Sequence, residues 1–228
     1  MAKPYLKKAI QVNPKYTEAW LLLGNAYLLG DKNFDSALIC LDNCLALNPH
    51  YGNAANNLKV LFNEWKNYPK EAEFYEKLAG RTNDNSEDYY MEAEAYIKLN
   101  YADQALGAIR KAIASKPDYS AAYALMGMVY GKQLNLMDSS LYYLNKAIQV
   151  DPNNWEAYEN MGVCYGIQKK YDDAIAILQK GIQLNPKYAK FYVNLGVTYN
   201  VMGNAVEGKK YLDKAFELDP SLKNPKQQ

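Results

Sequence analysis

The sequence has little positive charge of the kind that binds nucleic acid. Only two of its 26 basic residues are arginine, Arg81 and Arg110, and the formal net charge is +1. Arginine is the side chain best suited to gripping phosphate, so we expect no nucleic-acid partner and no anionic membrane surface as ligand. No run of 18 apolar residues occurs and the first residues lack an apolar signal core, so we expect no direct membrane insertion of this fragment.

Residues for catalysis or metal binding are equally scarce. His50 is the only histidine, and it follows Pro49 with no nucleophile placed beside it by a motif. Cys40 and Cys44 share a helical spacing but lack partner ligands, and Cys164 stands alone, so core packing is favoured over metal binding. An odd number of cysteines without a CxxC pair argues against a disulfide framework. We expect a cytoplasmic protein that is not an enzyme and uses no cofactor and no metal.

What the sequence does contain is a repeat of about 34 residues. Within a repeat, an aromatic residue, a glycine and a tyrosine follow at spacings of four and three, as in Trp20, Gly24 and Tyr27. One proline of the series is missing, and Asp84 stands about where it is expected. The prolines are separated by 35, 68, 35, 34 and 34 residues: Pro14, Pro49, Pro117, Pro152, Pro186 and Pro220. Periods of this length are typical of stacked helical repeats.

The pattern resembles the tetratricopeptide repeat, in which an aromatic residue, Leu-Gly, Tyr, Ala, a bulky residue, Ala and Pro recur over 34 residues. The best copies are Tyr158–Tyr165 and Tyr192–Tyr199, and the resemblance covers about residues 1–220. It implies an all-α, right-handed superhelical solenoid of antiparallel helix pairs, with about thirteen helices and the first helix of each pair on the concave surface. Pentatricopeptide repeats have a similar length, but they bind RNA and would carry basic charge.

The spacing divides the chain into a single array that starts within a repeat. The predicted parts are a half repeat 1–15, repeats of about 16–50, 51–85, 86–119, 120–153, 154–187 and 188–220, and a short tail 221–228. Because the first helix of the half repeat is absent, we expect the natural protein to extend upstream. We also expect apolar patches at both ends of the array, which would permit end-to-end self-association. The repeat 51–85 is the weakest copy, and it ends in a predicted loop that begins at Gly80.

The resemblance places ligand-binding positions on the concave side of each first helix, in the slot two residues before the glycine. Some family members place asparagines there that hydrogen-bond an extended peptide, because an amide both donates and accepts. The family's carboxylate clamp for chaperone tails is rejected, because the matching slots hold no cation. The slot holds Leu22, Asn57, Met91, Leu125, Asn160 and Asn194. The candidate binding residues are therefore Asn160, Asn194 and Asn57, with Glu156, Lys190 and Asn200 expected on the same surface; the alternative is that these are ordinary solvated residues.

These features predict a protein–protein interaction scaffold that binds a peptide or protein partner along a concave groove. An alternative is a non-catalytic repeat segment of a larger enzyme, for example of a membrane or glycosyltransferase type, or of an assembly factor. The fold alone does not identify the partner, because binding specificity in such arrays depends on surface residues.

Overall fold

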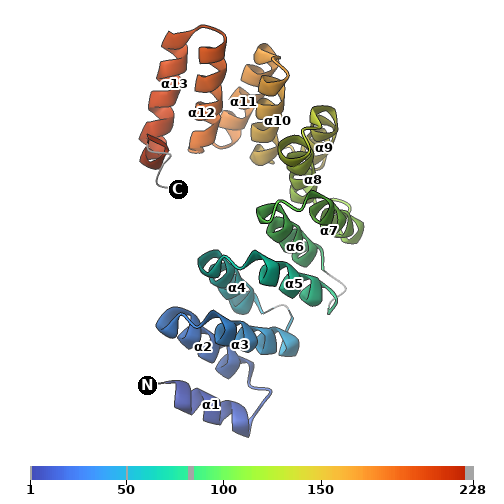
Figure 1. Ribbon diagram of the computed structural model, residues 1–228, viewed down its shortest axis with the longest axis vertical. Coiled ribbons are helices and arrows are strands. Elements are labelled where there is room, and N and C mark those ends of the chain that lie inside the picture. The colour runs from blue at the N-terminus through green and yellow to red at the C-terminus, as the bar shows by residue number, and fades with distance from the viewer. Residues whose placement is uncertain (1, 50, 82–84, 224–228) are drawn as a thin grey trace. The chain divides into compact units, whose positions relative to one another are not determined.

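The structure is a computed structural model that describes residues 2–49, 51–81 and 85–223. In this part of the chain there are thirteen α-helices and no strand, so the all-α prediction and the helix number are confirmed. The helices form two compact units (Figure 1): an N-terminal unit, Met1–Asn85, and a C-terminal unit, Ser86–Gln228. The division falls at the end of the loop predicted after Gly80. His50 and Asp84 lie outside the described residues.

The helices begin and end close to where the repeat predicts them. The last helix, Ala205–Leu218, lies in the second half of the predicted repeat 188–220. The N-terminal unit contains α1 (Lys3–Val12), α2 (Thr17–Asn25), α3 (Phe34–Leu47), α4 (Gly52–Trp65) and α5 (Tyr68–Ala79). The C-terminal unit contains α6 (Ser86–Lys98), α7 (Ala102–Ser115), α8 (Ser120–Met128), α9 (Met137–Val150), α10 (Trp155–Ile167), α11 (Tyr171–Leu184), α12 (Ala189–Val201) and α13 (Ala205–Leu218), followed by a short 3-10 turn, Pro220–Lys223.

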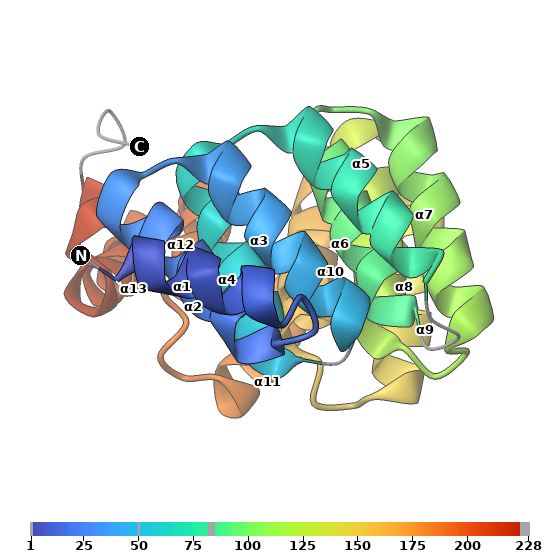
Figure 2. The same ribbon diagram turned by 90° about the horizontal axis from the view of Figure 1, so that it is seen from below.

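Within a repeat, the two helices pack side by side as a hairpin, as α10 with α11 and α12 with α13 do (Figure 1). Figure 2 shows the helices α1 to α5 of the N-terminal unit from below. The signature glycine of the first helix permits this close approach. A Cβ atom on Gly162 of α10 would lie 2.4 Å from a side-chain carbon of Leu178 in α11, which is too close for two carbon atoms. The Leu-Gly signal in the sequence therefore marks the contact between the two helices of a repeat.

Each hairpin turns through one residue in the left-handed region of the backbone. These residues have φ between 51° and 86°: Lys32, Lys66, Asn100, Asn135, Lys169 and Gly203. Glycine and asparagine adopt this conformation readily, whereas a lysine there is strained because its Cβ approaches the carbonyl oxygen. The turn geometry thus imposes the αL conformation even where the sequence does not favour it.

Replacing the strained lysine at one turn should stabilise the fold. Lys169 is exposed and has φ 60°, so Lys169→Gly removes backbone strain and is expected to raise the free energy of unfolding by about 0.5–1 kcal/mol after the entropy cost of glycine. Urea denaturation followed by circular dichroism measures the change. Gly203 has φ 86° at the matching turn, so the reverse substitution Gly203→Lys should destabilise by a similar amount. A loss of stability in Lys169→Gly would contradict the prediction.

Two first helices continue into a π-helical segment. These segments are Ala26–Asp31, which follows α2, and Val129–Gln133, which follows α8. Both segments lie in repeats whose prolines are 35 residues apart. In these repeats the signature glycine is followed thirteen residues later by the next small residue, as Gly24 is by Ala37 and Gly127 by Ser140. The same interval is twelve residues from Gly162 to Ala174. The extra residue is therefore taken up as a wider turn inside the first helix.

The predicted apolar ends are only partly observed. On α1, Tyr5 and Val12 are exposed. On α13 the exposed face is largely charged, because neighbouring turns carry the ion pairs Lys209–Asp213, Lys210–Glu207 and Lys214–Glu217, although Val206 is exposed. A surface of paired charges gives little driving force for association, so end-to-end self-association stays a prediction.

Candidate functional site

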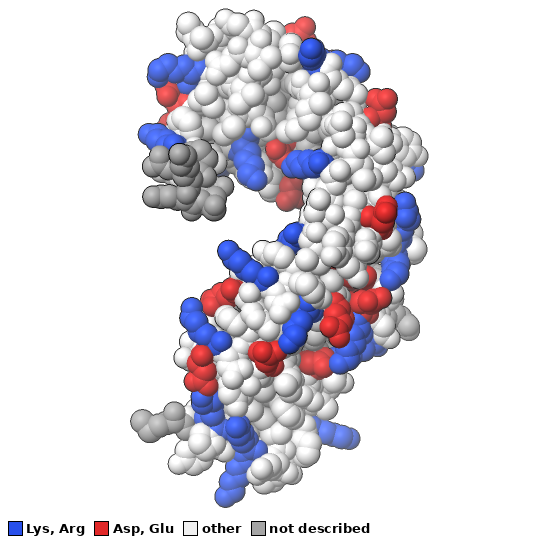
Figure 3. All heavy atoms as spheres, viewed as in Figure 1, with Lys and Arg blue, Asp and Glu red and all other residues white. Residues whose placement is uncertain are grey.

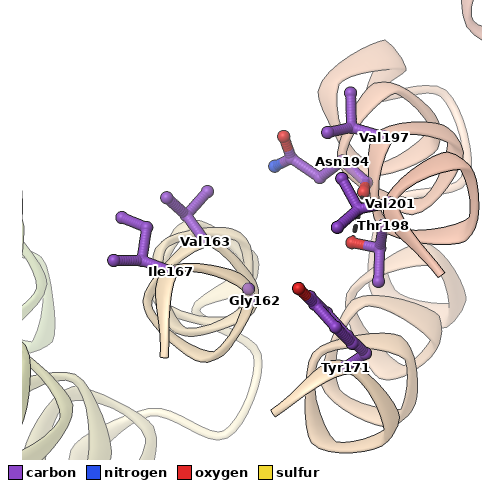
Figure 4. Close-up of a pocket in the computed structure, with 9 residues that line it drawn as sticks. Gly162, Val163, Ile167, Tyr171, Asn194, Val197, Thr198 and Val201 are labelled. Carbon is purple, nitrogen blue, oxygen red and sulfur yellow. Dashed lines mark hydrogen bonds between the residues drawn. The ribbon is translucent and has the colours of Figure 1, made fainter. Parts of the chain in front are cut away.

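The candidate site is a pocket between α10 and α12, the first helices of the last two repeats (Figure 4). Its volume is about 280 Å³. Three aliphatic side chains at its rim are more than half exposed: Ile167 (56%), Val197 (51%) and Val201 (61%). The full lining is Gly162, Val163, Gly166, Ile167, Tyr171, Asn194, Val197, Thr198 and Val201. Exposed aliphatic residues around one cavity are unusual on a solvated surface and are typical of a binding site.

The helical repeat itself brings these side chains together. Val163 and Ile167 are four residues apart on α10, and Val197 and Val201 are four apart on α12, so each pair lies on one helix face. Figure 4 shows Tyr171, from the start of α11, between the two helices. Because α10 and α12 occupy equivalent places in successive repeats, their matching faces border the same pocket.

Asn194 lies at the pocket and is held by a neighbouring helix. Its Nδ2 donates a hydrogen bond to Oε1 of Glu159 in α10, at 2.9 Å, and Glu159 is buried. The hydroxyl of Thr198 donates to the Asn194 backbone oxygen at 2.7 Å. No hydrogen bond to the Asn194 Oδ1 is found within the described residues. The amide is thus fixed in orientation, and its oxygen remains available to a donor.

Asn160 also has an acceptor oxygen with no partner. Its Nδ2 donates to the backbone oxygen of Glu156, one turn earlier in α10, at 3.0 Å. Its Oδ1 is shielded from water and accepts no hydrogen bond from the part of the chain that the structure describes. A shielded acceptor without a partner costs free energy, which an incoming N–H group would recover.

The remaining predicted residues are spread over different places. Asn57 belongs to the N-terminal unit, where its Nδ2 lies 2.6 Å from Oδ1 of Asn25. Lys190 is exposed, with its Nζ 6.0 Å from the centre of the Tyr188 ring. Asn57 therefore belongs to a different compact unit from Asn160 and Asn194.

The expected position of Asn200 is corrected by the structure. Its side chain lies over Gly208 of α13: a Cβ atom built on Gly208 would be 1.9 Å from the Asn200 Oδ1. The six residues that separate Asn194 and Asn200 turn a helix by about 600°, which leaves the two side chains about 120° apart. Asn200 therefore faces the second helix of its own repeat.

A second cluster on the first helices of the C-terminal unit combines carboxylates with tyrosines. The rings of Tyr90 and Tyr119 lie 5.5 Å apart. Burial raises the pKa of Tyr90, and the negative charges of Glu94 and Glu156 raise it further. Burial, and then Glu87 and Glu94, raise the pKa of Tyr119 to about 12. Both phenols are neutral at physiological pH, so the negative charge of the cluster resides on the carboxylates.

The acidic and apolar parts meet at α10. Burial raises the pKa of Tyr188 to about 12, and the nearby charges of Glu159 and Glu156 add to the shift. Glu159 is not among the predicted site residues, because the slot pattern marks only Asn160, the residue that follows it. On the face shown in Figure 3, acidic and basic side chains are scattered among uncharged ones, and basic side chains predominate at its lower end.

The cysteines lack the properties of reactive or metal-binding thiols. Cys40, Cys44 and Cys164 are buried, and burial raises the pKa of Cys40 and Cys44 to about 11. A protonated, buried thiol is a poor nucleophile and a poor ligand. Across the described residues there is no group of three or more His, Cys, Asp and Glu side chains placed to hold a metal. None of the helices in the described part of the chain has the length and apolar character needed to cross a membrane.

Family models for the tetratricopeptide repeat match most of the chain. One model matches residues 155–188, and a second matches residues 17–51, 89–119, 120–154 and 189–222. The matched segments correspond to the helix pairs α2–α3, α6–α7, α8–α9, α10–α11 and α12–α13. None of these segments spans the repeat 51–85, the weakest copy in the sequence.

Known proteins similar to the chain include one characterised relative and several solved structures. Anaphase-promoting complex subunit 3 of Schizosaccharomyces pombe is 26% identical over 129 residues, which are 57% of this chain and 19% of that protein, so the chain spans about a fifth of the relative's length. The crystal structure of MamA aligns with a TM-score of 0.53 and 18% identity over 88% of this chain and 96% of that chain. The Cut9–Hcn1 hetero-tetramer aligns with a TM-score of 0.68 and 17% identity over 94% and 42%. Both structures share the fold.

Proposed function

The chain belongs to the tetratricopeptide repeat family, a family of protein-interaction scaffolds, and we propose that its C-terminal unit binds an extended peptide segment of a partner protein in the pocket between α10 and α12. The observation that carries the proposal is the set of exposed aliphatic side chains around this pocket, Ile167, Val197 and Val201. Covering them with an apolar ligand side chain would remove their surface from water at about 25 cal/mol per Å².

The amide groups supply polar contacts to the peptide backbone. Asn194 presents an acceptor oxygen beside the pocket, and the shielded Asn160 Oδ1, which has no partner, would reach the peptide after its side-chain amide turns. Neighbouring packed helices are about 8–10 Å apart, and an extended peptide covers that distance in about three residues. Amides on α10 and α12 would therefore reach peptide groups about three residues apart, independently of the ligand side chains between them.

Removing the apolar rim of the pocket should weaken peptide binding without unfolding the chain. The probe is a synthetic ten-residue peptide taken from a random display library selected on the unmutated chain. The double variant Ile167→Ser/Val201→Ser removes two exposed aliphatic side chains, and we expect its dissociation constant to rise about tenfold or more in isothermal titration calorimetry. Because both residues are exposed, the melting temperature should change little.

The control is Val206→Ser on α13, which removes an aliphatic side chain of similar exposure away from the pocket. Its affinity for the peptide should equal that of the unmutated chain. Asn160→Ala tests the amide contact and should also weaken binding. Asn194→Ala is a poorer test, because it leaves the buried Glu159 carboxylate without its donor. A selected peptide that binds the double variant and the control equally would refute the proposed site.

A further inference from the structure

We infer that the pocket between α10 and α12 receives an aromatic side chain that carries a neutral hydrogen-bond donor, the indole of a tryptophan or the phenol of a tyrosine, as the anchor of the bound peptide. The inference rests on the proposed function and names the side chain that the same site selects. Three observations support it: the size of the pocket, the hydrogen-bonding character of its polar groups, and a glycine in its wall that helix packing does not require.

The pocket has the size and the apolar lining that suit a ring. Its volume is about 280 Å³, whereas a cavity of about 150 Å³ lined by apolar side chains is enough to hold a benzene molecule. Its aliphatic lining comes from both helices, with Val163 and Ile167 on α10 and Val197 and Val201 on α12. An aromatic ring would cover these side chains with a large apolar area at a small cost in conformational entropy.

The polar groups of the pocket offer acceptors to a ligand. The Asn194 Nδ2 is used in the hydrogen bond to Glu159, and the Thr198 hydroxyl donates to the Asn194 backbone oxygen, so lone pairs remain on both side chains. Figure 4 shows the Tyr171 hydroxyl directed into the space between α10 and α12. It has no hydrogen bond to any other described residue and can also accept. The ligand group that completes this set is therefore a donor.

The lining also limits which donor is suitable. None of the described residues that line the pocket is charged, so a lysine or arginine side chain would lose its hydration there without a counter-charge. Asparagine and glutamine bring little apolar surface to the aliphatic lining. Phenylalanine and leucine bring that surface but give the acceptor oxygens no donor. Tryptophan and tyrosine combine a large apolar body with one N–H or O–H group.

Gly166 in the pocket wall is not explained by helix packing. It lies inside α10 with a helical backbone, where glycine lowers stability relative to alanine. One turn earlier, Gly162 makes room for Leu178, and Gly131 at the matching place of the preceding repeat lies against Ser140. A Cβ atom at Gly166 would meet no atom within 4 Å, although the residue lines the pocket. The missing side chain therefore adds to the open space that a ligand ring would occupy.

Peptide selection on the full chain tests the anchor residue directly. Random ten-residue peptides displayed on phage are selected on the immobilised protein, and we expect tryptophan or tyrosine at one fixed position of the consensus. The consensus peptide is then synthesised with a donor-free ring at that position, benzothienylalanine for tryptophan or phenylalanine for tyrosine, and with alanine. Isothermal titration calorimetry should show affinity about fivefold weaker for the donor-free peptide and about thirtyfold weaker or more for the alanine peptide.

A matched pair of glycine variants tests the pocket wall. Gly166→Ala adds a methyl group beside the pocket and should weaken binding of the consensus peptide about tenfold, while the urea midpoint of unfolding rises. Gly107→Ala in α7 also places a Cβ atom in open space within a helix, away from the pocket lining. It should raise the urea midpoint without changing the affinity. A merely structural role of Gly166 would move stability and affinity in the same direction.

Three results would each overturn the inference: a consensus without tryptophan or tyrosine, a donor-free peptide that binds as tightly as its parent, or equal affinities of Gly166→Ala and Gly107→Ala. The proposed function would still stand in these cases if Ile167→Ser/Val201→Ser weakens binding of the selected peptide. A selection that yields no binding peptide would overturn both.

Discussion

Phe191→Ala is expected to lower the free energy of unfolding of the C-terminal unit by about 3–5 kcal/mol. Phe191 lies on α12, has no exposed surface and belongs to the apolar cluster with Leu178 and Leu195. Its ring lies 5.4 Å from that of Tyr188 and 6.4 Å from that of Trp155. Truncation removes the burial free energy of the ring and leaves a cavity at the junction of α10, α11 and α12, where the candidate site is formed.

Urea denaturation followed by circular dichroism measures this loss. Phe216 of α13 provides the control, because its ring is only partly buried and Phe216→Ala should cost clearly less. The peptide affinity of Phe191→Ala should also fall, since α12 carries Val197 and Val201. Equal destabilisation by the two substitutions would show that Phe191 is not the central packing residue of this unit.

Gly181→Ala should give the second large loss, about 2–3 kcal/mol. A Cβ atom at position 181 would lie 2.2 and 2.3 Å from two carbon atoms of the Phe191 ring. The ring is enclosed on all sides and cannot move away without disturbing its neighbours. Alanine has a higher helix propensity than glycine by about 1 kcal/mol, so a net loss would show that the steric clash outweighs that gain.

The control for helix propensity is Gly107→Ala in α7. An added Cβ at position 107 meets no atom within 4 Å, so this substitution should stabilise the chain slightly. In the background Phe191→Ala, the substitution Gly181→Ala should lose its cost, because the ring that it strikes is gone. Such non-additivity identifies a direct contact. Additive effects in the double variant would contradict this explanation.

The same pair of positions explains a departure of this repeat from the others. In two places the second small residue of a repeat and the residue ten positions later are both alanine. These pairs are Ala112 with Ala122 and Ala147 with Ala157, and all four side chains are buried. Between the last two repeats the pair is Gly181/Phe191. One side chain is smaller where the other is larger, so the absence of a Cβ at Gly181 leaves room for the Phe191 ring.

Much of the fold was predictable, because side chains of a given size recur at fixed positions of each repeat. The glycine and small-residue positions predicted which helix faces touch, and Gly162 against Leu178 shows the physical reason. The candidate site was less predictable. The slot singles out Asn160 and Asn194 as predicted binding residues, but the bond between Asn194 and Glu159 joins residues 35 positions apart and has no local signature. Asn200 was misplaced because a slot pattern ignores the rotation that accumulates over six residues.

The aliphatic rim of the pocket was also missed. Ile167 and Val201 each lie five residues after the signature glycine, at positions that carry Lys98 in α6, and the repeat pattern assigns no residue type there. Such positions do not serve the packing of the repeat, so their identity is free to serve a ligand. The residues of the proposed binding site therefore include positions at which the repeat pattern specifies no residue type.

The π-helical turns after α2 and α8 allow the side chains at the end of a first helix to change while the second helix keeps its packing. Adding one residue to a helix turns everything beyond it by about 100°. Because Ala26–Asp31 and Val129–Gln133 absorb that residue before the hairpin, the second helix keeps its place while the end of the first helix shows a different side chain to its surroundings. Inserting or deleting one residue just before the hairpin turn can thus change which side chains are exposed at the end of the first helix, while the packing of the helix pair is kept.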